Sequence, residues 1–178
     1  MTRMVINMPK NVKKSLIFTF NVVIFFFIAL LQHSTFINVH FLNIGATLII
    51  PLLVAFSLWH SPLASALAGM LSGFILDSSA HGSFCFNAIA LLIIGTFVSV
   101  ASSTLFNKNL PSAMVISLIC SASYYVVKWA IYHTFSEGIN NSLTFLLQIS
   151  LPSAILTAAF IFPFYFLYKY VEKIKAKI

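Results

Sequence analysis

Long apolar runs separated by short polar segments organise this chain of 178 residues. The runs are apolar on every face of a helix, not on one helical stripe or on alternate positions. This pattern is typical of helices surrounded by lipid, because a membrane β-barrel requires apolar and polar residues to alternate. Each run has about the length that a helix needs to cross a bilayer. The six predicted spans cover residues 15–36, 41–59, 62–78, 84–106, 111–134 and 143–168.

The segments between the runs are too short to separate domains, and the chain carries no internal repeat. Pro62 and Pro111 stand where the first turn of a helix tolerates proline. The first run could be mistaken for a signal peptide, but no small-residue cleavage site follows it, so it is interpreted as a true span. The sequence therefore predicts one integral membrane domain over residues 1–178, an all-α bundle of six transmembrane helices.

The amino-acid composition also indicates a lipid environment. Hydrophobic residues make up 60% of the chain and charged residues only 7%, against about a quarter in soluble domains. The net charge of +7 does not indicate a nucleic-acid partner, because most basic residues flank the first and last runs. Such placement favours membrane topology and contact with lipid headgroups. The flanking residues are Arg3, Lys10, Lys13 and Lys14 before the first run, and Lys169, Lys173, Lys175 and Lys177 after the last.

The same charges predict an orientation. With six spans both termini lie on one side, together with the connection that carries Lys108. The three connections on the other side contain no Lys or Arg. Because positive residues are enriched in cytoplasmic loops, both termini are predicted to face the cytoplasm.

Small residues follow one another at four-residue steps along the third run. Counting back from Asp77 gives Gly73, Gly69, Ser65 and Ser61. Helices in lipid associate through small residues that let their backbones approach closely, so this helix is predicted to pack along that row. The row fits either packing within the bundle or contact with a helix of a partner protein.

Asp77 ends this row near the predicted external interface, where a carboxylate requires hydration or hydrogen bonds. One hypothesis makes it a local acceptor for Ser79, for the backbone N–H groups that follow, or for His81. The other pairs it with Lys128, the one basic residue well inside a span. Lys128 also fits a position at the interface, with Trp129 and Tyr132 beside it.

The remaining polar residues form no catalytic pattern. The sequence contains no phosphate-binding loop, no Ser-His-Asp set and no H-E-x-x-H motif, so no enzymatic activity and no cofactor are predicted. The five histidines and the cysteines Cys85 and Cys120 show no metal-ligand spacing. Gln32, at the end of the first run, is predicted to donate a hydrogen bond between helices.

Three features together resemble a known family. Gln32 closes the first span, the sequence GMLSGFILD runs from Gly69 to Asp77, and Gly82 follows five residues later. This pattern, from about Gln32 to the fifth helix, resembles the MreD family of bacterial rod shape-determining membrane proteins. Cys85 occupies the place of a second turn glycine in the family pattern.

The resemblance implies a membrane scaffold in the machinery that elongates the cell wall. It implies a direct partner similar to MreC, a single-span membrane protein, and indirect partners in the MreB filament, RodA and its transpeptidase. It implies a location in the bacterial inner membrane and a fold similar to the substrate-binding subunits of energy-coupling-factor vitamin transporters. That fold suggests the alternative function, a vitamin-binding membrane subunit. Such subunits tend to carry an Ala-x-x-x-Ala face on the first helix, where this chain has NVVIFFFIALL.

Overall fold

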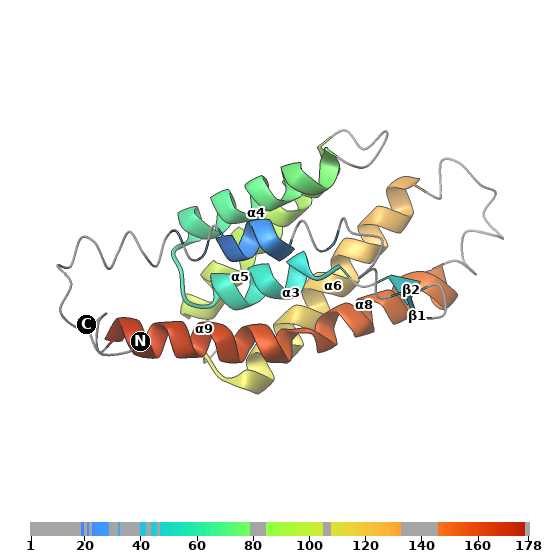
Figure 1. Cartoon of the computed structure of the whole chain (residues 1–178). Coiled ribbons are helices and arrows are strands. Elements are labelled where there is room, and N and C mark those ends of the chain that lie inside the picture. The colour runs from blue at the N-terminus through green and yellow to red at the C-terminus, as the bar shows by residue number, and fades with distance from the viewer. Residues whose placement is uncertain are drawn as a thin grey trace.

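The computed structural model describes residues 19, 21, 23–28, 32, 40–41, 44–45, 47–78, 85–104, 108–132 and 146–176. Within these residues every element is helical except one pair of two-residue strands, and the helices pack as a bundle (Figure 1). The all-α class predicted from the sequence is therefore confirmed. The elements are β1 (His40–Phe41), β2 (Ile44–Gly45), α3 (Ile49–Ser57), α4 (Pro62–Asp77), α5 (Phe86–Thr104), α6 (Leu110–Tyr132), the π-helix η1 (Leu146–Ser150), α8 (Leu151–Ala159) and α9 (Ile161–Ala176).

Three helical segments are long and apolar enough to cross a membrane. They are Phe86–Thr104, Leu110–Ile131 and Leu146–Lys173, while the apolar helix α4 is shorter. With 16 residues, α4 is about 24 Å long at 1.5 Å per residue. The described part of the first predicted span is also helical, at residues 23–28. These segments support the interpretation of the chain as a membrane protein.

The second predicted span differs in the structure. Among the described residues of this span, only Ile49–Ser57 form an α-helix, and the antiparallel strand pair β1–β2 precedes it. Nine residues extend only about 14 Å, which is too short to cross a bilayer of about 30 Å. Gly45 lies in the strand pair, and the backbone N–H of Thr47 bonds to the side chain of Thr157, so the helix starts late. All nine residues of α3 are buried at the centre of the bundle.

The helix of the last predicted span continues beyond the predicted end of the span, to Ala176. Helices η1, α8 and α9 follow one another along a single rod at the lower edge of the bundle (Figure 1). A turn at Phe160 separates α8 from α9. Pro163 lies in the first turn of α9, where its missing N–H costs no helical hydrogen bond. The helix therefore restarts after the turn and continues in the same direction.

The chain directions define two ends of the bundle. The Asp77 end contains the end of α4, the start of α5 and the end of α6. The Lys108 end contains the end of α5, the start of α6 and the carboxyl half of α9.

Candidate functional site

Helices α4 and α5 lie antiparallel, and three glycines bring their backbones into contact. A Cβ atom on Gly69 would lie 2.7 Å from the carbonyl carbon of Leu91, and one on Gly73 would overlap the Cα atom of Ala88. On the facing helix, a Cβ on Gly95 would lie 2.5 Å from the carbonyl oxygen of Ser65. Any side chain at these positions would force the backbones apart. The small residues of α4 thus face α5, not an open surface.

The serines of the row take different roles. Ser65 is fully buried in the contact, and Ser72, beside the row, donates to the carbonyl of Gly69 at 3.0 Å. Ser61 does not share this packing. It is exposed and has extended backbone angles, and its hydroxyl accepts from the N–H of Ala64 at 3.5 Å as the N-cap of α4. The helix starts at Pro62, so Ser61 precedes the helical face on which the other small residues lie.

Asp77 binds the start of the neighbouring helix. Its Oδ1 accepts from the backbone N–H of Asn87 at 3.2 Å and from the Asn87 side-chain amide at 2.9 Å. Its Oδ2 accepts from the backbone N–H of Ala88 at 3.0 Å. These are N–H groups of the first turn of α5, which lack partners within their own helix. The carboxylate also lies at the positive end of the α5 dipole. Asp77 is thus a cap supplied from another helix.

Asn87 extends this network to a third helix. The hydroxyl of Tyr124, on α6, donates to Oδ1 of Asn87 at 2.6 Å. Asn87 and Tyr124 are both buried. The amide of Asn87 can donate to Asp77 and accept from Tyr124 at the same time, which no hydrocarbon side chain could do. One residue therefore joins α4, α5 and α6 at the Asp77 end.

Lys128 does not form an ion pair with Asp77. Its ammonium lies 5.8 Å from the centre of the Tyr124 ring, within the range of a cation–π contact. Among the residues that the structure describes, no salt bridge links the two side chains. The oxygens of Asp77 bind the amides of Asn87 and Ala88 instead. The two residues of that hypothesis, Lys128 and Asp77, are connected only indirectly, through Tyr124 and Asn87.

A second polar cluster joins α6 to the other side of the bundle. The hydroxyl of Tyr125 lies 2.8 Å from that of Thr47 and 3.2 Å from that of Thr157. The Thr157 hydroxyl also accepts from the backbone N–H of Thr47 at 3.1 Å. One turn earlier on α6, the Ser121 hydroxyl donates to the carbonyl of Ala154 at 3.0 Å. Four hydroxyl groups thus fasten α6 to α8 and to the residues that lead into α3.

The other residues singled out in the sequence have simpler positions. Gln32 Oε1 accepts from the backbone N–H of Ile49 at 3.4 Å, so in this bond Gln32 is an acceptor at the start of α3 and not the predicted donor. Gly82, with Ser79 and His81 of the predicted turn, lies outside the described residues. Cys85 precedes α5 and has a positive φ of 49°, a conformation that favours glycine. That position is the one for which the family pattern has a turn glycine.

Several of these contacts were missed in the sequence. Gly95 is a single glycine in an apolar run, and Asn87 is the lone amide in the first turn of α5. A polar residue at the start of an apolar helix is a usable signal for interhelical bonding. The hydroxyls of Thr47, Tyr125 and Thr157 carry no comparable signal, because they are 32 to 110 residues apart in the chain.

The arrangement provides mechanical coupling between helices. Each acceptor oxygen of Asp77 binds at least one N–H donor, and the hydroxyls of the second cluster bind one another. Within the part of the chain that the structure describes, no group of three His, Cys, Asp or Glu side chains suits a metal ion. The site can therefore hold the α4–α5 pair against α6 in one geometry.

The sequence matches no family model, no curated protein and no solved structure.

Proposed function

We propose that this chain is a non-enzymatic membrane scaffold of the MreD type, which acts in the elongation of the bacterial cell wall. One observation carries the proposal. The segment from Gly69 to Asp77, on which the resemblance rests, organises a whole helix pair. Gly69 and Gly73 set the distance between α4 and α5, and Asp77 caps α5. A scaffold requires a pair of helices with a fixed geometry, and this segment supplies it.

The topology proposed with this function has six membrane-crossing segments in the bacterial inner membrane, the second of which crosses as the short helix α3 together with the residues that precede it. Both termini, with the Lys108 end, face the cytoplasm, following the distribution of Lys and Arg. The Asp77 end then faces outwards. A cysteine introduced at Ser79 should be labelled by a membrane-impermeant maleimide added to intact cells. Labelling only after the cytoplasmic side is opened would overturn this orientation.

The proposed direct partner is a single-span membrane protein similar to MreC. The exposed side of α4 offers it a continuous apolar face of Leu63, Leu67, Leu71 and Phe74. The MreB filament, RodA and its transpeptidase would be reached through that partner. No cofactor is required, because the role consists of holding helices and partners in place.

The decisive experiment combines rod-shape complementation with co-purification of the MreC-like protein. Gly73→Leu should abolish both, because Leu at this position overlaps the backbone of α5. Leu71→Phe, on the exposed side of the same helix, should leave the fold intact and test whether that side binds the partner. A wild-type chain that neither restores rod shape nor retains the partner contradicts the scaffold.

The second candidate function is that of a vitamin-binding membrane subunit, and one observation favours it. Thr47, Tyr125 and Thr157 bring three hydroxyls together near the Asp77 end. A small polar ligand requires such convergence. These hydroxyls bind one another, however, so a ligand would have to replace those bonds. Mass spectrometry of small molecules extracted from the purified protein distinguishes the two functions, since only the subunit should retain a vitamin.

A further inference from the structure

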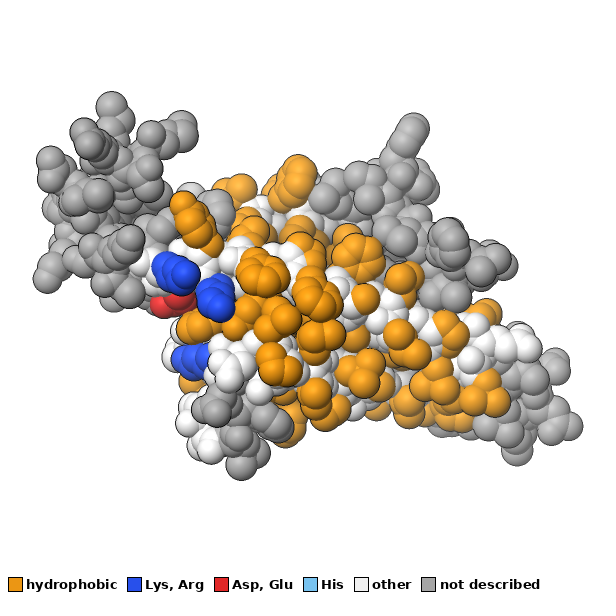
Figure 2. Space-filling model, turned by 90° about the horizontal axis from the view of Figure 1, so that it is seen from below, with side chains coloured by type: hydrophobic (Ala, Val, Ile, Leu, Met, Phe, Trp, Pro, Cys, Tyr) orange, Lys and Arg blue, Asp and Glu red, His pale blue; other side chains and the backbone are white. Residues whose placement is uncertain are grey.

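Three lysines gather at the Lys108 end of the bundle. Lys108, Lys169 and Lys173 are all exposed. Figure 2 shows basic side chains together at one end of the hydrophobic surface. Among the described residues, Glu172 is the one carboxylate near them along α9, three residues after Lys169 and directly before Lys173, so the cluster keeps an excess of positive charge. Lys128 lies near the opposite end of α6.

The geometry of α9 explains why these charges converge. Tyr165, Lys169 and Lys173 follow at four-residue steps, so their side chains lie along one face of the helix. The hydroxyl of Tyr165 donates to the carbonyl oxygen of Lys108 at 3.0 Å. This bond fastens the residues that lead into α6 to the same face of α9. Residues 57 positions apart in the chain are thereby brought together.

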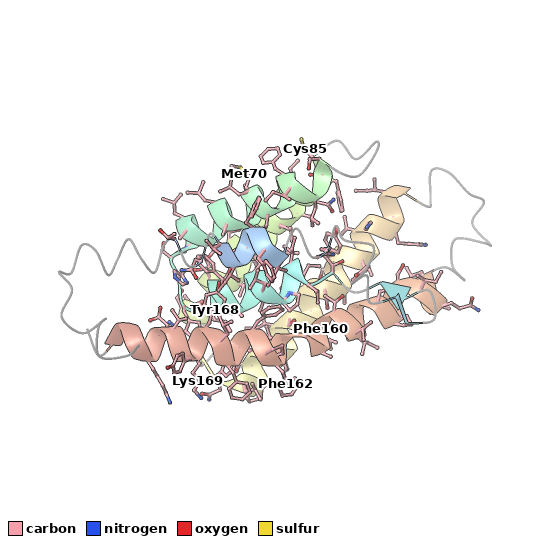
Figure 3. All side chains as sticks on the ribbon, in the orientation of Figure 1. Met70, Cys85, Phe160, Phe162, Tyr168 and Lys169 are labelled. Atoms are coloured by element: carbon pink, nitrogen blue, oxygen red, sulfur yellow. The ribbon has the colours of Figure 1, made fainter. Side chains whose placement is uncertain are left out.

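Aromatic rings hold two of the three ammonium groups. The Nζ of Lys108 lies 5.2 Å from the centre of the Trp59 ring, and the Nζ of Lys169 lies 5.6 Å from that of Tyr165. Figure 3 shows Lys169 directed away from the bundle, while its neighbour Tyr168 is directed inwards. A cation held over a ring loses less side-chain freedom when an anion binds to it.

Apolar side chains continue from the lysines towards the middle of the bundle. Phe162 and Phe166, on α9, expose 41% and 56% of their surface. Phe166 stands one turn before Lys169, and Phe162 one turn before that. A ligand at this place therefore meets cations at one end and apolar rings along its length. This arrangement matches a phospholipid, whose phosphate headgroup would contact the cations and whose acyl chains would contact the rings.

We infer that Lys108, Lys169 and Lys173 form a binding site for the phosphate headgroup of an anionic phospholipid, whose acyl chains lie along Phe162 and Phe166. The site is independent of the proposed scaffold function, because it uses none of the residues of the α4–α5 contact. It concerns the lipid of whichever leaflet meets the Lys108 end.

Native mass spectrometry of the full chain in detergent tests the inference. The protein is incubated with phosphatidylglycerol or with phosphatidylcholine, and the retained lipid is counted. Phosphatidylglycerol should bind more tightly than phosphatidylcholine. Replacing one lysine with Gln should weaken its binding about fivefold, and the triple change Lys108→Gln, Lys169→Gln and Lys173→Gln roughly a hundredfold. Inorganic phosphate should compete weakly, because it lacks the acyl chains.

Two control variants keep the test interpretable. Lys128→Gln removes one positive charge at the opposite end of α6 and should leave binding of phosphatidylglycerol unchanged. The triple replacement by Arg keeps all three charges and should also retain binding. If the triple Gln variant aggregates, the single variants Lys169→Gln and Lys173→Gln decide the result. Equal retention of both lipids, equal losses for Lys128→Gln and Lys169→Gln, or full competition by inorganic phosphate would each overturn the proposed site.

Discussion

Helices α5 and α6 are both long enough to cross a membrane, yet the bundle holds them in different ways. The contact of α5 with α4 has no side chains at its closest points, because Gly69, Gly73 and Gly95 stand there. The contacts of α6 consist of side chains, chiefly the hydroxyls of Tyr124, Tyr125 and Ser121. Lipid offers no hydrophobic driving force for either contact.

The difference predicts how each contact responds to substitution. A backbone contact tolerates no added atom, since the facing backbone cannot move aside as a flexible side chain can. A hydroxyl contact loses one bond when the hydroxyl is removed and keeps its shape. Changes in the α4–α5 contact should therefore be more damaging than changes around α6. Each variant below tests part of that comparison.

Gly73→Leu should have the largest effect. Even the Cβ atom overlaps Ala88, so α4 and α5 must separate, and the expected loss is about 3 kcal/mol or more. Unfolding by sodium dodecyl sulfate in mixed micelles measures the loss. Ser123→Leu is the matched control, because it adds a similar side chain to an exposed position of α6 and should change stability little. Equal stability of the two variants would show that the glycine contact does not hold the pair.

Asp77 should rank second. Asp77→Ala leaves the N–H groups of Asn87 and Ala88 without their acceptor, at an expected cost of about 2–3 kcal/mol. Asp77→Asn keeps one acceptor oxygen and should cost about 1 kcal/mol. The same unfolding measurement should rank wild type, Asn and Ala in that order. An Ala variant as stable as wild type contradicts the capping role.

The hydroxyl cluster of α6 should rank third. Tyr125→Phe and Thr157→Val should each cost about 1 kcal/mol, since each removes hydrogen bonds in a part-buried position. The double variant should lose less than the sum of the two, because the hydroxyls bind each other. Tyr170→Phe, at an exposed position of α9, serves as the control. Strict additivity would indicate that the two hydroxyls act separately.

Cys85→Gly should stabilise the fold slightly. A φ of 49° strains any residue with a Cβ atom, and glycine relieves that strain. The gain should be about 0.5–1 kcal/mol, because glycine also raises the entropy of the unfolded chain. Cys85→Ala separates the thiol from the backbone, since it removes the sulfur and retains the strain. A less stable Gly variant would mean that the thiol itself makes a favourable contact.

The smallest effect concerns Lys128. Without an ion pair to Asp77, Lys128→Met should not rescue Asp77→Asn, and the two changes should couple by less than about 0.5 kcal/mol. A double-mutant cycle from the same unfolding experiment gives the coupling. Clear rescue in the double variant would restore the hypothesis that the two charges form a pair.

The row of small residues on α4 could be predicted from the sequence only in part. Spacing alone placed Gly69 and Gly73 on one face of a helix, because helical geometry is local. The row does not say which helix it meets, and Gly95 completes the contact from 26 positions beyond Gly69. Ser61 lay in the same spacing but precedes the helix, because helix boundaries depend on capping as well as on periodicity.

The sequence by itself determined the solvent, the helical class and the approximate bounds of α4, α5 and α6. These follow from composition and from the length of apolar runs, which are properties of consecutive residues. Only the tertiary structure decided that α3 is a nine-residue buried helix and that Asp77 binds α5 in preference to Lys128. Both outcomes depend on which polar groups from distant segments of the chain come into contact. In an interior without water, buried polar groups must form hydrogen bonds with one another, so these contacts decide where each bond is made.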